Sequence, residues 1–153
     1  MKVHFICRGN VFRSLIAESY FNSLHLPDIK AISSGTMADA RREFNLEYFE
    51  RTKVLLAQHG VSPLSKDGAT QLNQQRLDSH DITICMNDPV YEEARAIVDL
   101  PAHTRIWHVE DIGEGKRVDL SQGRGPHEES GFQEIKSLVD NLVQELASTT
   151  APA

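Results

Sequence analysis

The strongest constraint on the fold is the segment Cys7-Arg8-Gly9-Asn10-Val11-Phe12-Arg13-Ser14, which joins an apolar run to an amphipathic one. Residues 3–6 before it have the composition of a strand. Residues 15–21 after it carry apolar side chains at helical spacing. The segment is therefore expected to be a loop between the carboxyl end of a strand and the amino end of a helix.

A loop in this position favours anions. Its N–H groups and those of the first helical turn lack backbone partners, and the helix dipole adds about half a positive charge. Arg13 offers a planar fork of donors that fits two oxygens of a tetrahedral oxyanion. Gly9 permits a sharp turn, and Asn10 either bonds the loop to itself or tolerates left-handed backbone. These features predict a phosphate or arsenate site.

Cys7 lies at the base of this expected site. Elsewhere a cysteine at a strand end is usually a small buried hydrophobe. Here N–H donors, Arg13 and the Ser14 hydroxyl would stabilise a thiolate, so we expect Cys7 to be ionised at neutral pH. The pattern therefore predicts a nucleophile rather than a packing residue.

Apolar runs alternate with helical patterns along the rest of the chain, which is typical of a parallel α/β sheet. We expect a single three-layer domain over residues 1–148, with a central sheet of about four strands flanked by helices and the phosphate loop after strand 1. A loose C-terminal tail is expected over residues 149–153, and a long surface loop over residues 113–131. Strands are expected near residues 3–7, 31–34, 82–86 and 105–109, and helices near residues 13–24, 44–59, 90–98 and 132–147.

Composition restricts the partners of the protein. The 153 residues, 40% hydrophobic and 25% charged, suit one soluble domain. A net charge of −6 argues against nucleic acid and acidic membrane surfaces. No apolar run is long enough to span a bilayer, and no signal-peptide pattern is expected. Two cysteines, one of them required as a free thiolate, suit the cytoplasm.

The segment from Cys7 to Ser14 resembles the Cys-x5-Arg-Ser loop of the low-molecular-weight protein tyrosine phosphatases. Ser33-Ser34-Gly35-Thr36, Ile82 to Met86 and Trp107 to Asp111 are similar to later segments of that family, and the likeness extends over residues 1–145. It implies a cysteine-dependent phosphatase that hydrolyses phosphomonoesters through a phosphocysteine intermediate. The implied substrate is a phosphotyrosine protein, an aryl phosphate or another small phosphomonoester.

The resemblance assigns roles to the loop and to one aspartate. Cys7 is the expected nucleophile and Asp111 the expected general acid and base, while Ser14 stabilises Cys7 as it leaves the phosphoenzyme. No cofactor or metal is expected, because Arg13 and the backbone donors already neutralise the phosphate. The residues expected to bind substrate with Arg13 are Arg8, Gly9, Asn10, Val11, Phe12 and Ser14.

Two other aspartates compete with Asp111, because Ile112 stands where the family has a proline. Asp88-Pro89 has the familiar dipeptide, but it is better explained as a helix N-cap followed by proline at the first helical position. Asp119 lies later in the same expected loop and stays a rival.

Other departures concern the substrate. Met37-Ala38-Asp39 replaces a frequent aromatic wall and no tyrosine follows Asp111, which argues against stacking on a phosphotyrosine ring. Val11 retains an apolar spot that suits an aryl or alkyl leaving group. Arg8 either points outward and favours acidic substrates or is simply solvated. Asp67 stands where relatives often have a histidine bonded to the loop asparagine, so that support must come from elsewhere.

Cysteine usage leaves alternatives open. Phe12 replaces the cysteine that forms a protective disulfide in many relatives, and Cys85 is expected to be structural, or else to trap an oxidised Cys7. Arsenate reductases of this fold need a further thiol, where this chain has Glu92. The competing functions are therefore an arsenate reductase-like enzyme, a catalytically weak module that binds phosphorylated ligands, and a phosphocysteine carrier, against which Arg13 argues.

Overall fold

The first apolar run forms a strand that is buried on both sides. In the computed structural model, which describes residues 1–62 and 64–150, this strand is β1 (Lys2–Cys7), and all its residues after Lys2 are buried. It pairs in parallel with β2 (Lys30–Gly35) on one side and β3 (Ile82–Cys85) on the other. Burial on both sides is typical of a parallel sheet that is covered by helices on each face.

A short strand, β4 (Arg105–Ile106), completes the sheet in the order β2-β1-β3-β4, with every pair parallel. The predicted four-stranded parallel sheet is confirmed. The strand expected over residues 105–109 is shorter than predicted. Its continuation still follows β3, since Trp107 N donates to Cys85 O and Val109 N donates to Met86 O.

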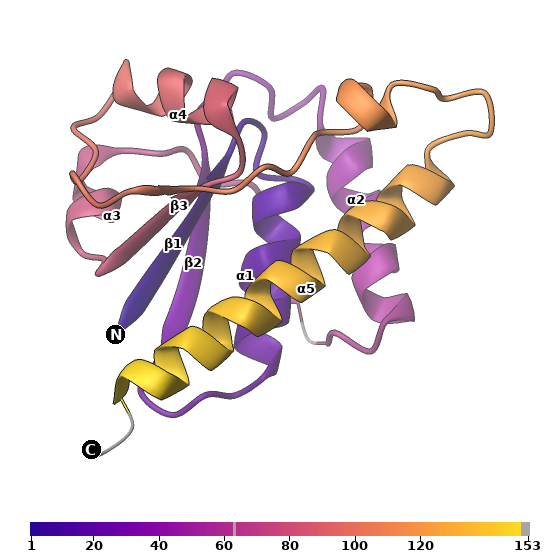
Figure 1. Cartoon of the computed structure of the whole chain (residues 1–153). Coiled ribbons are helices and arrows are strands. Elements are labelled where there is room, and N and C mark those ends of the chain that lie inside the picture. The colour runs from indigo at the N-terminus through magenta and orange to yellow at the C-terminus, as the bar shows by residue number, and fades with distance from the viewer. Residues whose placement is uncertain (63, 151–153) are drawn as a thin grey trace.

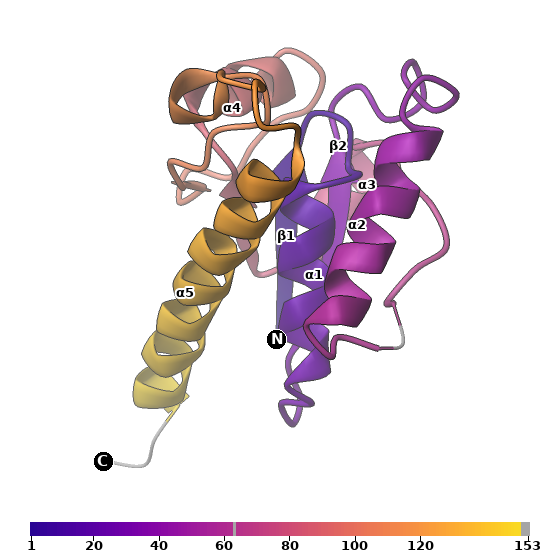
Figure 2. The same cartoon turned by 90° about the vertical axis from the view of Figure 1, so that its right-hand side faces the viewer.

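Helices form the two outer layers (Figures 1 and 2). On one side of the sheet α1 (Arg13–Ser23) packs against β1 and β2, and α5 (Gly125–Thr150) and α2 (Leu46–Gln58) pack against α1. Because the sheet and two helices surround it, α1 is buried along residues 13–21. On the other side lie α4 (Asp88–Arg95) and the single turn α3 (Gln74–Asp78), whose apolar residues form a separate core cluster with Ile6 and Cys85.

The structure corrects several predicted boundaries. The expected surface loop over residues 113–131 ends at Arg124, because α5 begins at Gly125 and includes His127. Pro126 lies in the first helical turn, where its missing N–H costs no hydrogen bond. The loop also contains a 3-10 turn (Gly115–Arg117) in which Arg117 is buried.

The remaining differences are short. Sequence reasoning missed α3, which Asn73 caps by accepting a hydrogen bond from Arg76 N. The helix expected over residues 90–98 spans Asp88–Arg95 instead. Residues 149 and 150 of the predicted tail belong to α5, and its last three residues lie outside the described residues. Within residues 1–62 and 64–150, no helix is long and apolar enough to cross a membrane.

Candidate active site

Cys7 lies where β1 ends, directly before the loop that leads into α1. Its side chain is 2% exposed, and Asn10 N donates a hydrogen bond to its Sγ at 3.2 Å. The Ser14 hydroxyl lies 2.9 Å from the same sulfur. Asn10 adopts left-handed backbone with φ 59°, a conformation that asparagine tolerates. The loop therefore directs hydrogen-bond donors at Cys7, as the sequence predicts.

The amino end of α1 is open to an anion. Phe12 occupies its N-cap position and makes no side-chain capping hydrogen bond. The N–H groups of the first helical turn therefore have no side-chain acceptor, and a bound oxyanion can serve as one.

A chain of buried polar groups holds the loop from behind. The Asn10 amide donates to Ser14 Oγ at 2.7 Å and to Ser33 Oγ at 2.8 Å. Ser33 in turn donates to the carboxylate of Glu18 at 2.7 Å. Since Ser14 accepts from Asn10, its own hydroxyl proton is available to Cys7. The network polarises Ser14 as a donor toward the sulfur.

Lys66 and Thr70 supply the support that Asp67 cannot. Both Lys66 Nζ and Thr70 N donate to Asn10 Oδ1, the latter at 2.9 Å. Lys66 Nζ also lies 3.7 Å from the buried carboxylate of Glu18. Burial lowers the pKa of Lys66 from 10.5 to about 8. Lys66 thus supports Asn10 in place of the histidine that relatives often have at the position of Asp67. It stands one residue before Asp67 in the sequence.

Gly35, at the end of β2, lets this strand approach the loop. A Cβ atom at this position would lie 2.6 Å from Arg8 O, closer than real Cβ contacts, and a tight 3.0 Å from Asn10 N. The Ser-Ser-Gly-Thr segment therefore contributes a close backbone contact as well as the hydroxyl of Ser33.

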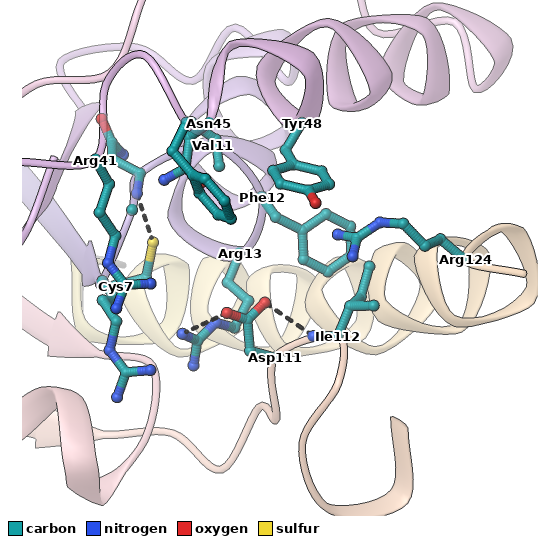
Figure 3. A pocket seen from close by; sticks show the side chains of 14 residues that line it. Cys7, Val11, Phe12, Arg13, Arg41, Asn45, Tyr48, Asp111, Ile112 and Arg124 are labelled. Atoms are coloured by element: carbon teal, nitrogen blue, oxygen red, sulfur yellow. Dashed lines mark hydrogen bonds and ion pairs between the residues drawn. The ribbon is translucent and has the colours of Figure 1, made fainter. Parts of the chain in front are cut away.

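Arg13 and Asp111 meet on the open side of the loop (Figure 3). Arg13 is 2% exposed and donates to Val109 O at 3.1 Å. Its Nη2 lies 3.5 Å from Asp111 Oδ2, while Asp111 Oδ1 accepts from Ile112 N at 2.8 Å. The structure thus brings the expected acid to the pocket that holds Cys7.

The rival aspartates lie outside this pocket. Asp119 is exposed and accepts a hydrogen bond from Ser121 N, which lowers its pKa and disfavours a proton donor. Asp88 is the first residue of α4, and the cap is Asn87, whose side chain accepts from Val90 N at 3.0 Å. The prediction that Asp88 caps this helix is wrong by one residue.

A buried arginine holds the acid loop, in which Ile112 replaces the proline expected from the resemblance. Arg117 is 1% exposed, donates to Glu110 O at 2.9 Å and pairs with Glu134 at 2.7 Å. Gly113 N donates to Arg117 O, which closes the loop directly after Asp111. Sequence reasoning missed this residue because arginine is usually exposed.

Arg8 neither points outward to a substrate nor remains solvated. Its guanidinium donates twice to Glu93 on α4, with Nη2 at 2.8 Å, and lies 3.5 Å from Glu114. Hydrogen bonding to Glu93 raises the pKa of Arg8. The side chain therefore ties the loop to α4, although it also forms part of the pocket wall.

Aromatic side chains line the pocket after all. Phe44 and Tyr48 come from the start of α2 and the turn before it, and Phe12 and Ile112 complete the apolar wall. The expectation that such a wall is absent is wrong, because the aromatic residues come from a different segment. The pocket has a volume of about 190 Å³, and its remaining lining residues are Cys7, Arg8, Gly9, Asn10, Val11, Arg13, Arg41, Asn45, Asp111 and Arg124.

Cys85 faces away from the nucleophile. It pairs with Ile6 in the sheet, and both side chains belong to the core cluster on the α4 face. Cys7, the next residue of β1, belongs to the cluster on the α1 face. Burial raises the pKa of Cys85 to about 12. These observations assign Cys85 a packing role and do not favour trapping of an oxidised Cys7.

Comparison with known proteins places this site in a family. A family model described as low molecular weight phosphotyrosine protein phosphatase matches residues 2–151. The structure is similar to YfkJ from Bacillus subtilis, at 21% identity and a TM-score of 0.73, over 99% of this chain and 97% of that chain. It is also similar to the phosphatase VcLMWPTP-2 from Vibrio cholerae O395, at 21% identity and a TM-score of 0.71, over 99% of each chain.

An arsenate reductase has the same fold. The protein from Archaeoglobus fulgidus DSM 4304 is 26% identical, with a TM-score of 0.59 over 93% of this chain and 98% of that chain. No curated protein sequence matches the chain.

Proposed function

Because the chain belongs to the low molecular weight phosphotyrosine protein phosphatase family and is a phosphatase, we propose that it hydrolyses phosphotyrosine in proteins, or a similar aryl phosphate, through a phosphocysteine. The observation that carries the proposal is one pocket that combines Cys7, Arg13 and Asp111 with an aromatic wall. The nucleophile, the anion clamp and the proton donor are thus within reach of one bound phosphate.

In the first step the Cys7 thiolate attacks phosphorus opposite the leaving oxygen. A sulfur–phosphorus bond forms as the phosphorus–oxygen ester bond breaks, and protonated Asp111 gives its proton to the departing oxygen. Arg13 and the loop N–H groups hold the other phosphate oxygens, where charge develops in the transition state.

The contact between Arg13 and Asp111 suggests how substrate prepares the acid. The Arg13 guanidinium is 3.5 Å from the Asp111 carboxylate. A phosphate dianion offers Arg13 a bidentate partner of higher charge. Arg13 then binds the phosphate oxygens instead of Asp111, and the Asp111 carboxyl group, which lines the same pocket, is left to face the leaving oxygen.

In the second step Asp111 takes a proton from water, which attacks the phosphocysteine. The sulfur–phosphorus bond breaks and orthophosphate forms. The departing thiolate is stabilised by Asn10 N–H and by the Ser14 hydroxyl, which lie 3.2 Å and 2.9 Å from Sγ. The buried network through Asn10 holds both donors in place before the reaction begins.

Aromatic residues at the pocket mouth favour an aryl leaving group. Tyr48, Phe44 and Ile112 offer apolar surface beside the phosphate site, and Val11 adds an apolar side chain within the loop. A phosphoarginine substrate would instead bring a guanidinium group beside the guanidinium groups of Arg41 and Arg124. The pocket therefore fits an aromatic ring better than a cation.

The cysteines do not support the arsenate reductase alternative. Thiol relay needs a second cysteine that can reach the first. The sequence contains only Cys7 and Cys85, and Cys85 is buried in the cluster on the opposite face of the sheet. A purely binding module is disfavoured because Asp111 lies in the pocket with Cys7 and Arg13.

We also place the reaction in the cytoplasm, with phosphorylated proteins as partners. A free Cys7 thiolate persists best in a reducing compartment. The net charge of −6 disfavours nucleic acid and anionic membranes as partners.

A substrate panel tests the proposal. Wild type, Cys7→Ser and Cys85→Ala are assayed on aryl phosphates, phosphotyrosine and phosphoarginine peptides, and alkyl phosphates. We expect wild type and Cys85→Ala to prefer aryl phosphates and phosphotyrosine, and Cys7→Ser to lack turnover while retaining the wild-type melting temperature. Substantial hydrolysis by Cys7→Ser, or preference for phosphoarginine or alkyl phosphates, would overturn the assignment.

A further inference from the structure

Two arginines at the catalytic pocket have no carboxylate partner among the described residues. Arg41 and Arg124 line the same pocket as Cys7. Every other arginine forms an ion pair with a carboxylate or, in the case of Arg76, donates to Ser33 and Ser34. Acidic groups are abundant, since the chain has 22 acidic against 16 basic residues. Two guanidinium groups therefore remain for a ligand at the same site.

Helical spacing places Arg41 with the aromatic wall. Hydrogen bonds from Asn45 N to Arg41 O and from Phe49 N to Asn45 O continue the α2 pattern backward into the preceding turn. Arg41, Phe44, Asn45 and Tyr48 are thus three or four residues apart and share one face, which lines the pocket.

Arg124 approaches the same wall from the start of α5. Its guanidinium carbon lies 4.3 Å from the centre of the Tyr48 ring, and its Nε is buried without a hydrogen-bond partner. In Figure 3, Arg41 extends toward the Cys7 side of the pocket, whereas Arg124 lies beyond Tyr48 on the other side. The two cations therefore flank the surface on which an aryl ring would rest.

The size of the pocket determines what these cations meet. Sites for drug-sized ligands measure about 300–1,000 Å³, whereas this pocket measures about 190 Å³. A pocket of this size suits the phosphate and ring of one phosphotyrosine, and the neighbouring residues of a protein substrate would then lie outside it. Arg41 and Arg124 line this pocket and are only partly buried, so their guanidinium groups are open to groups bound next to the phosphotyrosine.

Charges inside the pocket are already matched. Arg13 pairs with Asp111, and Arg8 is held by Glu93 and Glu114. The loop amides and Arg13 serve the phosphate, so the positive charges of Arg41 and Arg124 are in excess of what the reacting group requires.

We propose that Arg41 and Arg124 form an anion subsite that selects phosphotyrosine segments with acidic side chains next to the phosphotyrosine. This inference rests on the proposed function and refines its substrate class. The sequence suggested Arg8 as the residue that favours acidic substrates, but Arg8 is paired with Glu93. Arg41 and Arg124, which the sequence did not single out, take that role instead.

Matched phosphotyrosine peptides test the subsite. One peptide carries glutamates on both sides of the phosphotyrosine, and the other carries glutamines at the same positions. The ratio of kcat/KM for the two peptides is measured for wild type, Arg41→Gln, Arg124→Gln and the double variant. Arg42→Gln is the matched control, because Arg42 is adjacent in sequence but pairs with Asp39 outside the pocket.

We expect wild type to prefer the acidic peptide. Each single substitution should reduce that ratio about fivefold, which corresponds to about 1 kcal/mol for a partly exposed charge pair. The ratio should stay unchanged in Arg42→Gln and approach unity in the double variant. In wild type the preference should shrink at about 1 M salt, where the Debye length is about 3 Å.

The outcomes separate this inference from the proposed function. Hydrolysis of both peptides at the same rate by wild type, or equal ratios in wild type and the double variant, would overturn the subsite and leave the phosphatase intact. Absence of hydrolysis would overturn the proposed function, and the subsite is then decided by binding of the two peptides to Cys7→Ser with and without the arginine substitutions. Equal affinities in that measurement would overturn the subsite as well.

Discussion

Replacing Asp111 by asparagine separates proton transfer from the other parts of the site. Asparagine has the same shape, and its carbonyl oxygen can still accept the hydrogen bond from Ile112 N that Asp111 Oδ1 accepts at 2.8 Å. What it loses is the proton for the leaving oxygen and the ion pair with Arg13 at 3.5 Å. Since Asp111 is about one-third exposed, with a side chain 34% accessible, the lost ion pair alters stability little.

The magnitude follows from the role of a general acid. Positioned proton transfer contributes about 10²–10⁴-fold to a rate, or about 3–5 kcal/mol. An unactivated phenol such as tyrosine needs that proton to leave. We therefore expect Asp111→Asn to hydrolyse phenyl phosphate and phosphotyrosine about 100-fold to 10,000-fold more slowly. A nitrophenol leaves readily as its anion, so its first step should be much less affected.

A series of aryl phosphates with graded leaving groups provides the assay. Release of the phenol in a single turnover is plotted against the pKa of the leaving phenol, for wild type, Asp111→Asn and Asp119→Asn. We expect a steep dependence only for Asp111→Asn. Asp119→Asn is the control because it has the same chemistry in the exposed part of the same loop.

Two results would refute this reasoning. If Asp111→Asn gave a line parallel to that of wild type, Asp111 would not donate the proton in the first step. If Asp119→Asn gave the steep line instead, the acid would be the rival aspartate and the loop would have to move on substrate binding.

Two further predictions concern buried groups. Because burial lowers the pKa of folded Lys66 from 10.5 to about 8, the unfolded chain binds more protons between those pH values. Cys85, whose pKa is raised by burial, has the opposite effect above pH 9, but it is common to wild type and Lys66→Met. The free energy of unfolding of wild type should therefore rise by up to about 3 kcal/mol across this window relative to that of Lys66→Met. Peroxide should oxidise Cys7 to sulfinic and sulfonic acid without a bridge to Cys85, as peptide mass mapping would show.

Both predictions have clear counter-results. Lys136→Met removes a partly exposed lysine and should show the same rise relative to Lys66→Met as wild type does. Loss of the relative rise in this control, or its absence in wild type, would contradict the first. Recovery of a disulfide between Cys7 and Cys85 would contradict the second, because the two side chains lie in core clusters on opposite faces of the sheet.

The loop and the sheet could be predicted because their signals are local. The Cys7 to Ser14 segment contains its own turn residues, nucleophile and anion clamp, and the apolar runs on either side of it have clear strand and helix periods. The parallel sheet then follows from the alternation of strands and helices. The choice of Asp111, in contrast, rests on the family resemblance, because Ile112 replaces the expected proline and no local signal identifies the acid.

The wall and the supports of the site depend on tertiary contacts. Phe44 and Tyr48 line the pocket because the start of α2 folds over the loop, which no local pattern indicates. Lys66, which is mostly buried, and Arg117, which is fully buried, form ion pairs with Glu18 and Glu134, which are distant in sequence. Burial of this kind runs against the usual exposure of charged residues, so sequence reasoning assigns them to the surface.

The beginning of α5 was missed because glycine and proline usually indicate a loop. Gly125 and Pro126 lie in the first turn, where neither breaks the helix. Glu128, which follows in the same helix, is buried and forms an ion pair with Arg51 of α2, with Arg51 Nη2 2.6 Å from Glu128 Oε1. This contact between two helices holds a segment whose local sequence favours irregular structure.

Direct detection of a phosphorylated Cys7 tests the central claim. Asp111→Asn is mixed with para-nitrophenyl phosphate, because this leaving group does not need the acid while the missing base slows hydrolysis of the intermediate. A rapid denaturing quench is followed by mass mapping of the peptide that contains Cys7. We expect this peptide to gain the mass of one phosphoryl group, in step with the burst of nitrophenol, and to stay unmodified in Cys7→Ser. Continued turnover with Cys7 unmodified at every quench time would contradict the covalent mechanism.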